Sequence, residues 1–397
     1  MLQIEESAPR GASWLRLGFR PFFLAASFFA ALAMLVWLVL FNGYLTLPLS
    51  GLPAIAWHGH EMLFGYSMAV VTGFLLTAVR NWTGIATVRG TPLLLLLLCW
   101  LLARLLLALG DSASIPYAAT FDLLFNLGFL VAVAIPVLRA RNWSQVGILV
   151  KIALLAASNL AFYLGAAGVL ASGIVIGLYS GLYLVLALIL MLSRRVFPFF
   201  IERGVGYPVQ LTNRKWLDIS SVVLFLVFWL ADILRPNSLA VSLLALVLLV
   251  LHGVRIIGWY TPGIWKKPLL WSLYLGYASI IAGFALKAAV YPFNLSPYLA
   301  LHAFAAGGVG LVTAGMMARI ALGHTGRDVG DPPPVLVPIF LILVAAALVR
   351  VALPILDVLH YHLWVTVSQC LWIAAFTWLG LRYLPILTGP RVDGQDG

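Results

Sequence analysis

Five histidines of this 397-residue chain form three groups, and imidazole is a side chain that binds metals. His58 and His60 are separated by one glycine, His302 stands alone, and His360 and His362 form a second His-x-His pair. Neutral imidazole is the commonest metal ligand in proteins, and it ligates haem iron from either face of the macrocycle. The grouping therefore predicts a metal centre with haem as its cofactor, and copper is left open as a second metal.

The spacing within each pair limits how its two imidazoles can be used. On an α-helix, residues i and i+2 point about 200° apart, so His58 and His60 cannot share one metal unless the helix end is unwound. Either they serve two sites on opposite sides of the helix, or one ligates while the other bonds to a loop. Glu61 follows His58 at i+3 and shares its face, which makes it the predicted proton carrier.

Ionisable residues also lie inside long apolar runs at Glu61, Arg104, Asp122, Lys287 and Arg350. A charge at the centre of a membrane helix costs roughly 2.5–3.5 kcal/mol, so each of these needs a partner or a function. The propionates of haem are anionic, and we expect Arg104, Lys287 and Arg350 to be their partners. The alternative is that these cations pair with the two carboxylates or extend to the membrane surface.

The elements that must position these residues are membrane-spanning helices. The chain is 63% apolar and only 9% charged, whereas soluble proteins carry roughly 25% charged residues. Runs of roughly 20 apolar residues each span a bilayer as a helix. We expect an all-α polytopic membrane protein, with residues 1–397 forming one transmembrane domain. The expected spans run approximately over 21–41, 55–79, 91–110, 117–138, 147–168, 173–193, 217–234, 238–259, 269–291, 297–321, 333–356 and 361–385.

The positions of lysine and arginine predict the orientation of these twelve helices. With a cytoplasmic N-terminus, all but four of the 24 basic residues fall on the cytoplasmic side, as the positive-inside rule requires. The even number of helices returns the C-terminus to the cytoplasm. The three histidine groups then lie near the outer ends of the second, tenth and twelfth helices. The roles of His252 and His324, which lie on the inner side, stay open.

The same distribution accounts for the net charge of +11 without a nucleic-acid partner. The basic residues occupy short loops and form no continuous basic face, so we exclude nucleic-acid binding. The expected surroundings are the lipid bilayer.

Three stretches resemble a known family. The run Trp57-His58-Gly59-His60-Glu61-Met62-Leu63-Phe64-Gly65 resembles a signature of the NnrS family. The run from His302-Ala303-Phe304 to Gly323-His324-Thr325-Gly326-Arg327 resembles the second signature, and Arg16-Leu17-Gly18-Phe19-Arg20-Pro21-Phe22-Phe23 resembles the N-terminal segment. The likeness covers nearly the whole chain.

This resemblance implies a haem- and copper-containing protein of the bacterial cytoplasmic membrane that handles nitric oxide. The family is linked to denitrification and to resistance against nitrosative stress. The matching motifs carry His58, His60, His302 and His324. The second helix is also similar to the haem-bearing helix of haem–copper oxidases and nitric oxide reductases, although this chain has no paired histidines on helix 7 and no His-x-His on helix 10.

Three hypotheses of function follow from these observations. The first is a haem-binding membrane protein of nitric oxide metabolism, with His58 or His60 and His302 on the iron and His360 or His362 as a second metal site or axial ligand. The second is an oxidoreductase that converts nitric oxide with an unidentified electron donor. The third, a membrane transporter, ranks last because no inverted halves are visible.

Overall fold

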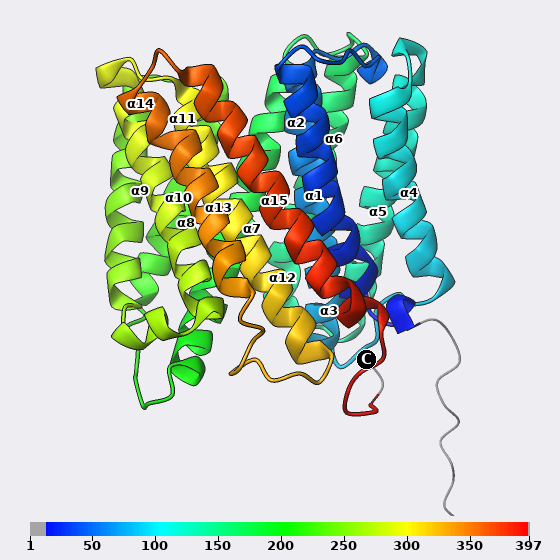
Figure 1. Cartoon of the computed structure of the whole chain (residues 1–397), viewed down its shortest axis with the longest axis vertical. Helices are drawn as coiled ribbons and strands as arrows, with labels where there is room; N and C mark the ends of the chain where they lie inside the picture. The colour runs from blue at the N-terminus through cyan, green and yellow to red at the C-terminus, as the bar shows by residue number, and fades with distance from the viewer. Residues whose placement is uncertain (1–12, 396–397) are drawn as a thin grey trace, which may run out of the picture.

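The computed structural model describes residues 13–395, and within this range the chain is helical with no strands. Twelve helical segments of the described chain are long and apolar enough to cross a membrane, and they stand side by side as one bundle (Figure 1). The all-α class and the expected number of spans are therefore confirmed. Residues 1–12 and 396–397, and with them the two chain ends, lie outside the described residues.

Most spans are single helices, and five are built from consecutive helical segments. The second comprises α2 (Ala54–His60), the π-helix η3 (Glu61–Ser67) and α3 (Met68–Thr83), and the tenth comprises α11 (Pro297–His302), the π-helix η7 (Ala303–Val309) and α12 (Gly310–His324). The others are α1 (Phe19–Phe41), α4 (Thr91–Leu109), η4 (Ser112–Ser114) with α5 (Ile115–Arg139), η5 (Trp143–Gln145) with α6 (Val146–Ala166), α7 (Gly173–Gly204), α8 (Lys215–Leu234), α9 (Leu239–Gly258), α10 (Pro268–Phe293), α13 (Leu336–Val351) followed by α14 (Leu353–Leu356), and α15 (Tyr361–Thr388). Short 3₁₀ turns lie at η1 (Ser13–Leu15), η2 (Leu49–Gly51) and η6 (Pro262–Lys266).

The spans pack in an order that places two of them at the centre. Helices that follow one another in the chain are neighbours, as in α4 with α5, α6 with α7 and α9 with α10, while α15 returns to pack against α1. The apolar windows of the second and tenth spans are each 72% buried, whereas that of α1 is 33% buried. These two central spans carry the histidines of both family signatures.

A π-helix interrupts each central span directly after a histidine. The segment η3 begins immediately after His60, and η7 begins immediately after His302. Such i→i+5 segments are rare and occur frequently at functional sites. No periodicity in the sequence predicts them, because the apolar residues continue through both segments without a break.

The largest difference from the expected spans is the length of α7. This helix continues to Gly204, well beyond the expected end at 193, because Phe197 and Ile201 extend its buried face past the charged residues Arg194 and Arg195. The hydropathy of a run therefore marks where the membrane core ends, and the helix itself ends later.

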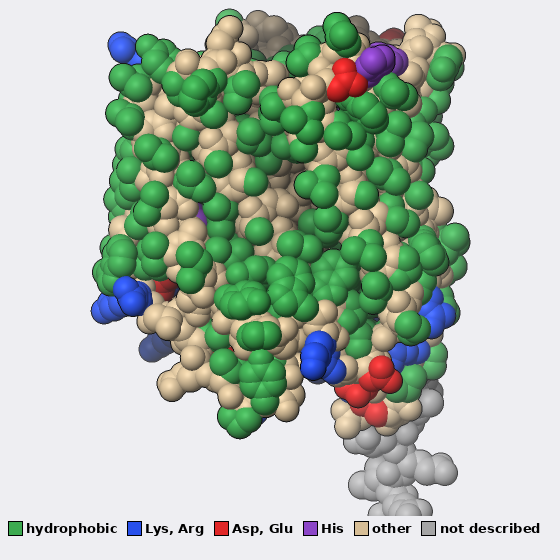
Figure 2. Space-filling view, turned by 60° about the vertical axis from the view of Figure 1, so that its left-hand side comes forward, with side chains coloured by type: hydrophobic (Ala, Val, Ile, Leu, Met, Phe, Trp, Pro, Cys, Tyr) green, Lys and Arg blue, Asp and Glu red, His purple; other side chains and the backbone are tan. Residues whose placement is uncertain are grey.

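The surface of the bundle separates apolar and basic side chains. Hydrophobic side chains cover the middle of the face in Figure 2, and most of its lysines and arginines gather toward the end at which α15 terminates. The helix α1 begins at this same end (Figure 1), which is called the proximal end below. The distribution agrees with a cytoplasmic proximal end, and that orientation stays a prediction. The distal end is the one where α2 and α11 begin.

Candidate metal centre

His302 is held by its own helix in an orientation that suits a metal ligand. Its Nδ1 donates a hydrogen bond of 2.7 Å to the carbonyl oxygen of Tyr298, one turn earlier in α11. A carbonyl can only accept, so the proton is on Nδ1 and the lone pair is on Nε2. Histidines that ligate metals show this arrangement, because a hydrogen bond to the other ring nitrogen fixes both tautomer and ring orientation.

His58 is positioned by stacking. Its ring lies parallel to the Trp37 indole of α1, with 4.7 Å between centroids and 10° between planes. Its Nδ1 is buried and finds no hydrogen-bond partner among the described residues. Buried polar atoms are nearly always paired in folded proteins, so an unpaired imidazole nitrogen indicates a position where a ligand or ion binds.

The two histidines and Arg350 of α13 form one group, called the histidine site below. The charge of Arg350 acts on both imidazoles, and His58 and His302 are close enough to influence each other. Arg350 is buried and donates to the Tyr361 hydroxyl at 3.4 Å, while its Nη1 has no partner within residues 13–395. The site thus combines two imidazoles with a cation that has a free donor.

His60 lies on the other side of the same helix, within a buried ionic cluster. Its Nδ1 is 3.0 Å from Glu61 Oε1, and its Nε2 is 2.9 Å from Asn159 Oδ1. Arg104 forms an ion pair with Asp122 and lies 3.4 Å from Glu61. Both ring nitrogens of His60 are therefore engaged within the protein, and the structure does not bring this histidine to His58 and His302.

Lys287 belongs to a third buried group, which joins α7, α8 and α10. It pairs with Asp232 of α8 at 2.8 Å and donates to Asn237 at 3.2 Å, and the Tyr183 hydroxyl donates to the same aspartate at 2.5 Å. Of the three cations predicted to meet propionates, the structure brings Arg350 to the histidines, whereas Lys287 and Arg104 each pair with carboxylates. Such pairing is the alternative that the sequence left open for them.

His362 is connected to the histidine site through two aromatic rings. It stacks on Phe41 with 4.6 Å between centroids and 15° between planes. The Phe41 ring centroid is 5.5 Å from that of Trp37, and the Trp37 indole stacks on the His58 ring. His362 therefore lies beside the site without contacting His302.

The remaining histidines are engaged elsewhere. His360 is exposed and its Nδ1 is 2.8 Å from the Asp357 carboxylate. His252 is buried with its Nδ1 2.6 Å from the Tyr277 hydroxyl, and its Nε2 has no partner among the described residues. His324 ends α12 at the proximal end, where its ring lies 5.7 Å from that of Phe19. The structure brings none of these three to His302.

Several residues that shape these groups are absent from the sequence-based prediction. Trp37, the Tyr298 carbonyl, Asn159 and Tyr163 were missed, although Tyr163 donates to Asp122 at 2.9 Å. Asn159 is a polar residue inside the apolar run of α6, and this is a signal that could have identified it. The Tyr298 carbonyl gives no signal, since every residue has one.

The donor set of the histidine site consists of the two imidazoles of His58 and His302. Within residues 13–395, no group of three or more His, Cys, Asp or Glu side chains is placed to hold a metal ion. Zinc sites need three or four protein ligands, whereas haem iron takes only one or two axial ligands from the protein. Two imidazoles beside a cation fit that requirement.

Comparison with known proteins identifies the family. The family model described as NnrS protein matches residues 13–391, a range that includes all twelve spans and both histidine motifs. No curated protein is similar enough to match. The match confirms the resemblance found in the motifs, and the chain therefore belongs to the NnrS family of nitric-oxide-related membrane proteins.

Proposed function

We propose that this protein binds haem at the histidine site and binds nitric oxide there, in the bacterial cytoplasmic membrane. The observation that carries the proposal is His302, whose Nδ1–H is tied to the Tyr298 carbonyl so that Nε2 is available as a ligand. Ferrous haem binds nitric oxide strongly. The residues of the chain supply the ligands, the counter-charge and the apolar surroundings.

The two imidazoles are held with unequal firmness. A hydrogen bond within α11 fixes the ring of His302. His58 is held by stacking on Trp37, and its Nδ1 has no partner in the described part of the chain. His302 would therefore be the more firmly held of the two ligands, and His58 the more mobile one.

Arg350 is the residue suited to bind a propionate. Its buried Nη1 lacks a partner within residues 13–395, and a guanidinium binds a carboxylate with two parallel charge-assisted hydrogen bonds. A buried arginine with a free donor is costly unless an anion completes it.

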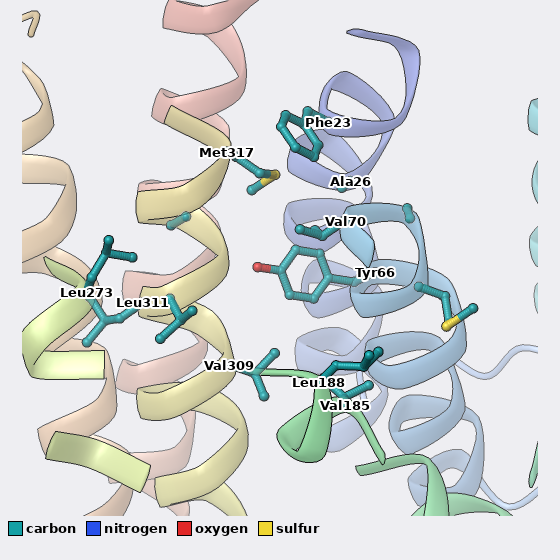
Figure 3. Close-up of a cluster of buried hydrophobic side chains, with 14 of the residues drawn as sticks. Phe23, Ala26, Tyr66, Val70, Val185, Leu188, Leu273, Val309, Leu311 and Met317 are labelled. Carbon is teal, nitrogen blue, oxygen red and sulfur yellow. The ribbon is translucent and has the colours of Figure 1, made fainter. Parts of the chain in front are cut away.

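A small apolar cavity offers nitric oxide a place within the bundle. The cavity has a volume of about 70 Å³ and lies between α1, α3, α7 and α12, with Phe23, Val70 and Val185 among its lining residues. A water molecule needs only about 10–15 Å³ of such volume, so a diatomic molecule fits. Tyr66 points across this region toward α12, where its hydroxyl hydrogen-bonds Thr313 in the cavity wall at 2.5 Å (Figure 3).

Turnover of nitric oxide is the second proposed function, and Glu61 favours it. Its Oε2 is buried without a partner among the described residues, although its Oε1 lies with His60 and Arg104 and not, as the i+3 spacing predicts, on the face of His58. Copper as a second metal also stays a proposal, with His362, which is linked to the site through Phe41 and Trp37, as a candidate ligand. Consumption of more than one equivalent of nitric oxide by purified protein with an electron donor would separate turnover from binding.

The central test is a pigment analysis of protein purified after haem-sufficient growth. We expect a haem absorption band that shifts on addition of nitric oxide. The variant His302→Ala should lose the band, and His58→Ala should keep a weaker band with altered ligation. The matched control, His360→Ala, should resemble the wild type, with gel filtration verifying folding of each variant. A colourless, iron-free wild type would overturn the proposal.

A further inference from the structure

A second and larger cavity lies at the proximal end of the bundle, remote from the histidine site. Its volume is about 390 Å³, and its walls come from the end of α7, the start of α10, the end of α12 and the loop that follows α12. These elements meet at the end where α15 terminates (Figure 1). Nothing in the proposed haem function uses this cavity.

The walls of the cavity carry an excess of positive charge. Arg203, Lys267 and Arg319 line it together with one carboxylate, Asp328. That carboxylate accepts a hydrogen bond of 2.6 Å from the Gly330 N–H, so it is directed to the backbone of its own loop. The cavity therefore keeps two more positive than negative groups.

The two arginines have free donors. Within residues 13–395, neither Arg203 nor Arg319 forms a hydrogen bond or an ion pair, and each instead lies over an aromatic ring. The Arg319 guanidinium carbon is 3.8 Å from the centroid of the Phe200 ring. A stacked guanidinium keeps its N–H donors in its own plane, directed outward from the edge.

The start of α10 adds to the positive potential in the cavity. Pro268, Leu269 and Leu270, the first residues of this 26-residue helix, form part of the cavity wall. The N-terminus of a helix carries partial positive charge, which favours an anion there, although the Leu270 N–H of this helix already donates to the Lys267 carbonyl. Arginine forks and a helix N-terminus together match the tetrahedral oxygens of a phosphate group.

We propose that this cavity binds a phosphate group, supplied by the headgroup of an anionic lipid or by free phosphate. The cavity is large enough for a headgroup, and it lies at the ends of membrane spans, where headgroups are found. Recognition rests on Arg203 and Arg319, with Lys267 as a point charge whose Nζ also donates to the Gly330 carbonyl at 2.9 Å.

The test compares two probes on full-length purified protein. Inorganic phosphate is titrated in detergent, and thermal unfolding is measured in nanodiscs of phosphatidylglycerol and of phosphatidylcholine. The variants are Arg203→Gln and Arg319→Gln, and the control is Arg139→Gln, an exposed arginine that ends α5 outside the cavity. Arg203 is exposed, so its replacement preserves the fold even if Arg319→Gln disturbs the stacking.

We expect each cavity variant to bind its probe about tenfold more weakly, which corresponds to the loss of one charge-assisted hydrogen bond, while the control binds like the wild type. Saturable phosphate binding without a lipid effect identifies the free ion, and stabilisation by phosphatidylglycerol alone identifies the lipid. The proposal is overturned if neither probe distinguishes the cavity variants from the wild type, or if Arg139→Gln weakens binding equally.

Discussion

His58 and His60 lie two positions apart in α2, and their surroundings are opposite. Both nitrogens of His60 meet oxygens at 3.0 and 2.9 Å within an ionic cluster. His58 stacks on Trp37, and its buried Nδ1 has no partner in the described chain. Buried imidazoles with satisfied nitrogens stabilise a fold, and those with free nitrogens are available for binding. The comparison thus divides one motif into a structural histidine and a ligand.

The largest effect on stability should come from the ionic cluster around His60. Replacing Arg104 by Ala leaves Glu61 and Asp122 buried without their cation, and breaking a buried ion pair in this way costs roughly 3–5 kcal/mol. We expect a large fall in the unfolding temperature of the purified protein. The exposed Arg235→Ala is the control and should stay within about 0.5 kcal/mol of the wild type. Equal stability of the two variants would show that the cluster is unimportant for folding.

Substitution of His60 tests whether His58 and His60 differ in role. The variant His60→Ala leaves Glu61 and Asn159 without a partner, which should cost roughly 1–3 kcal/mol. We nevertheless expect its haem band to persist, whereas His58→Ala weakens that band with a smaller loss of stability. Paired absorption spectra and thermal unfolding curves test this. If the folded His60→Ala protein lacked haem, the assignment of the two histidines would be wrong.

A smaller effect, on haem affinity, should follow from replacing Arg350, which lies beside the two histidine ligands and is not itself proposed as a ligand. We expect Arg350→Gln to lower haem affinity roughly 10–100-fold, the usual range for residues that surround metal ligands. Titration of apoprotein with haem measures this, and Arg350→Lys should recover part of the affinity because it restores the charge. Unchanged affinity in Arg350→Gln would remove this residue from the site.

The exposed pair of Asp357 and His360 should have the smallest effect. A hydrogen bond from His360 lowers the pKa of Asp357 below its usual value. Because the lowered pKa means that the folded protein favours the carboxylate, the pair stabilises at neutral pH, and this contribution is lost as pH falls through the lowered pKa. Unfolding curves of the wild type and Asp357→Asn should converge in acid, with identical haem spectra. A spectral change would place His360 at the metal.

The sequence predicts the parts of this molecule that depend on local composition. Twelve spans follow from runs of apolar residues, because a bilayer imposes the same length on each. The opposed directions of His58 and His60 follow from helical geometry alone. In contrast, the pairing of Lys287 with Asp232 depends on how α8 and α10 pack, and no local pattern encodes it. The same holds for Asn159 beside His60, since 99 positions separate them.

The two π-helices make the length of the central spans as important as their composition. A seven-residue π segment follows His60, and another follows His302. Each π segment holds about one residue more than the α-helix that would replace it, so deleting one residue from it would leave the two flanking segments nearly in their present relative rotation. The same deletion within α3 or α12 would turn everything beyond it by about 100°. The π segments are therefore the places where these spans could lose a residue with His58 and His302 still facing their present neighbours.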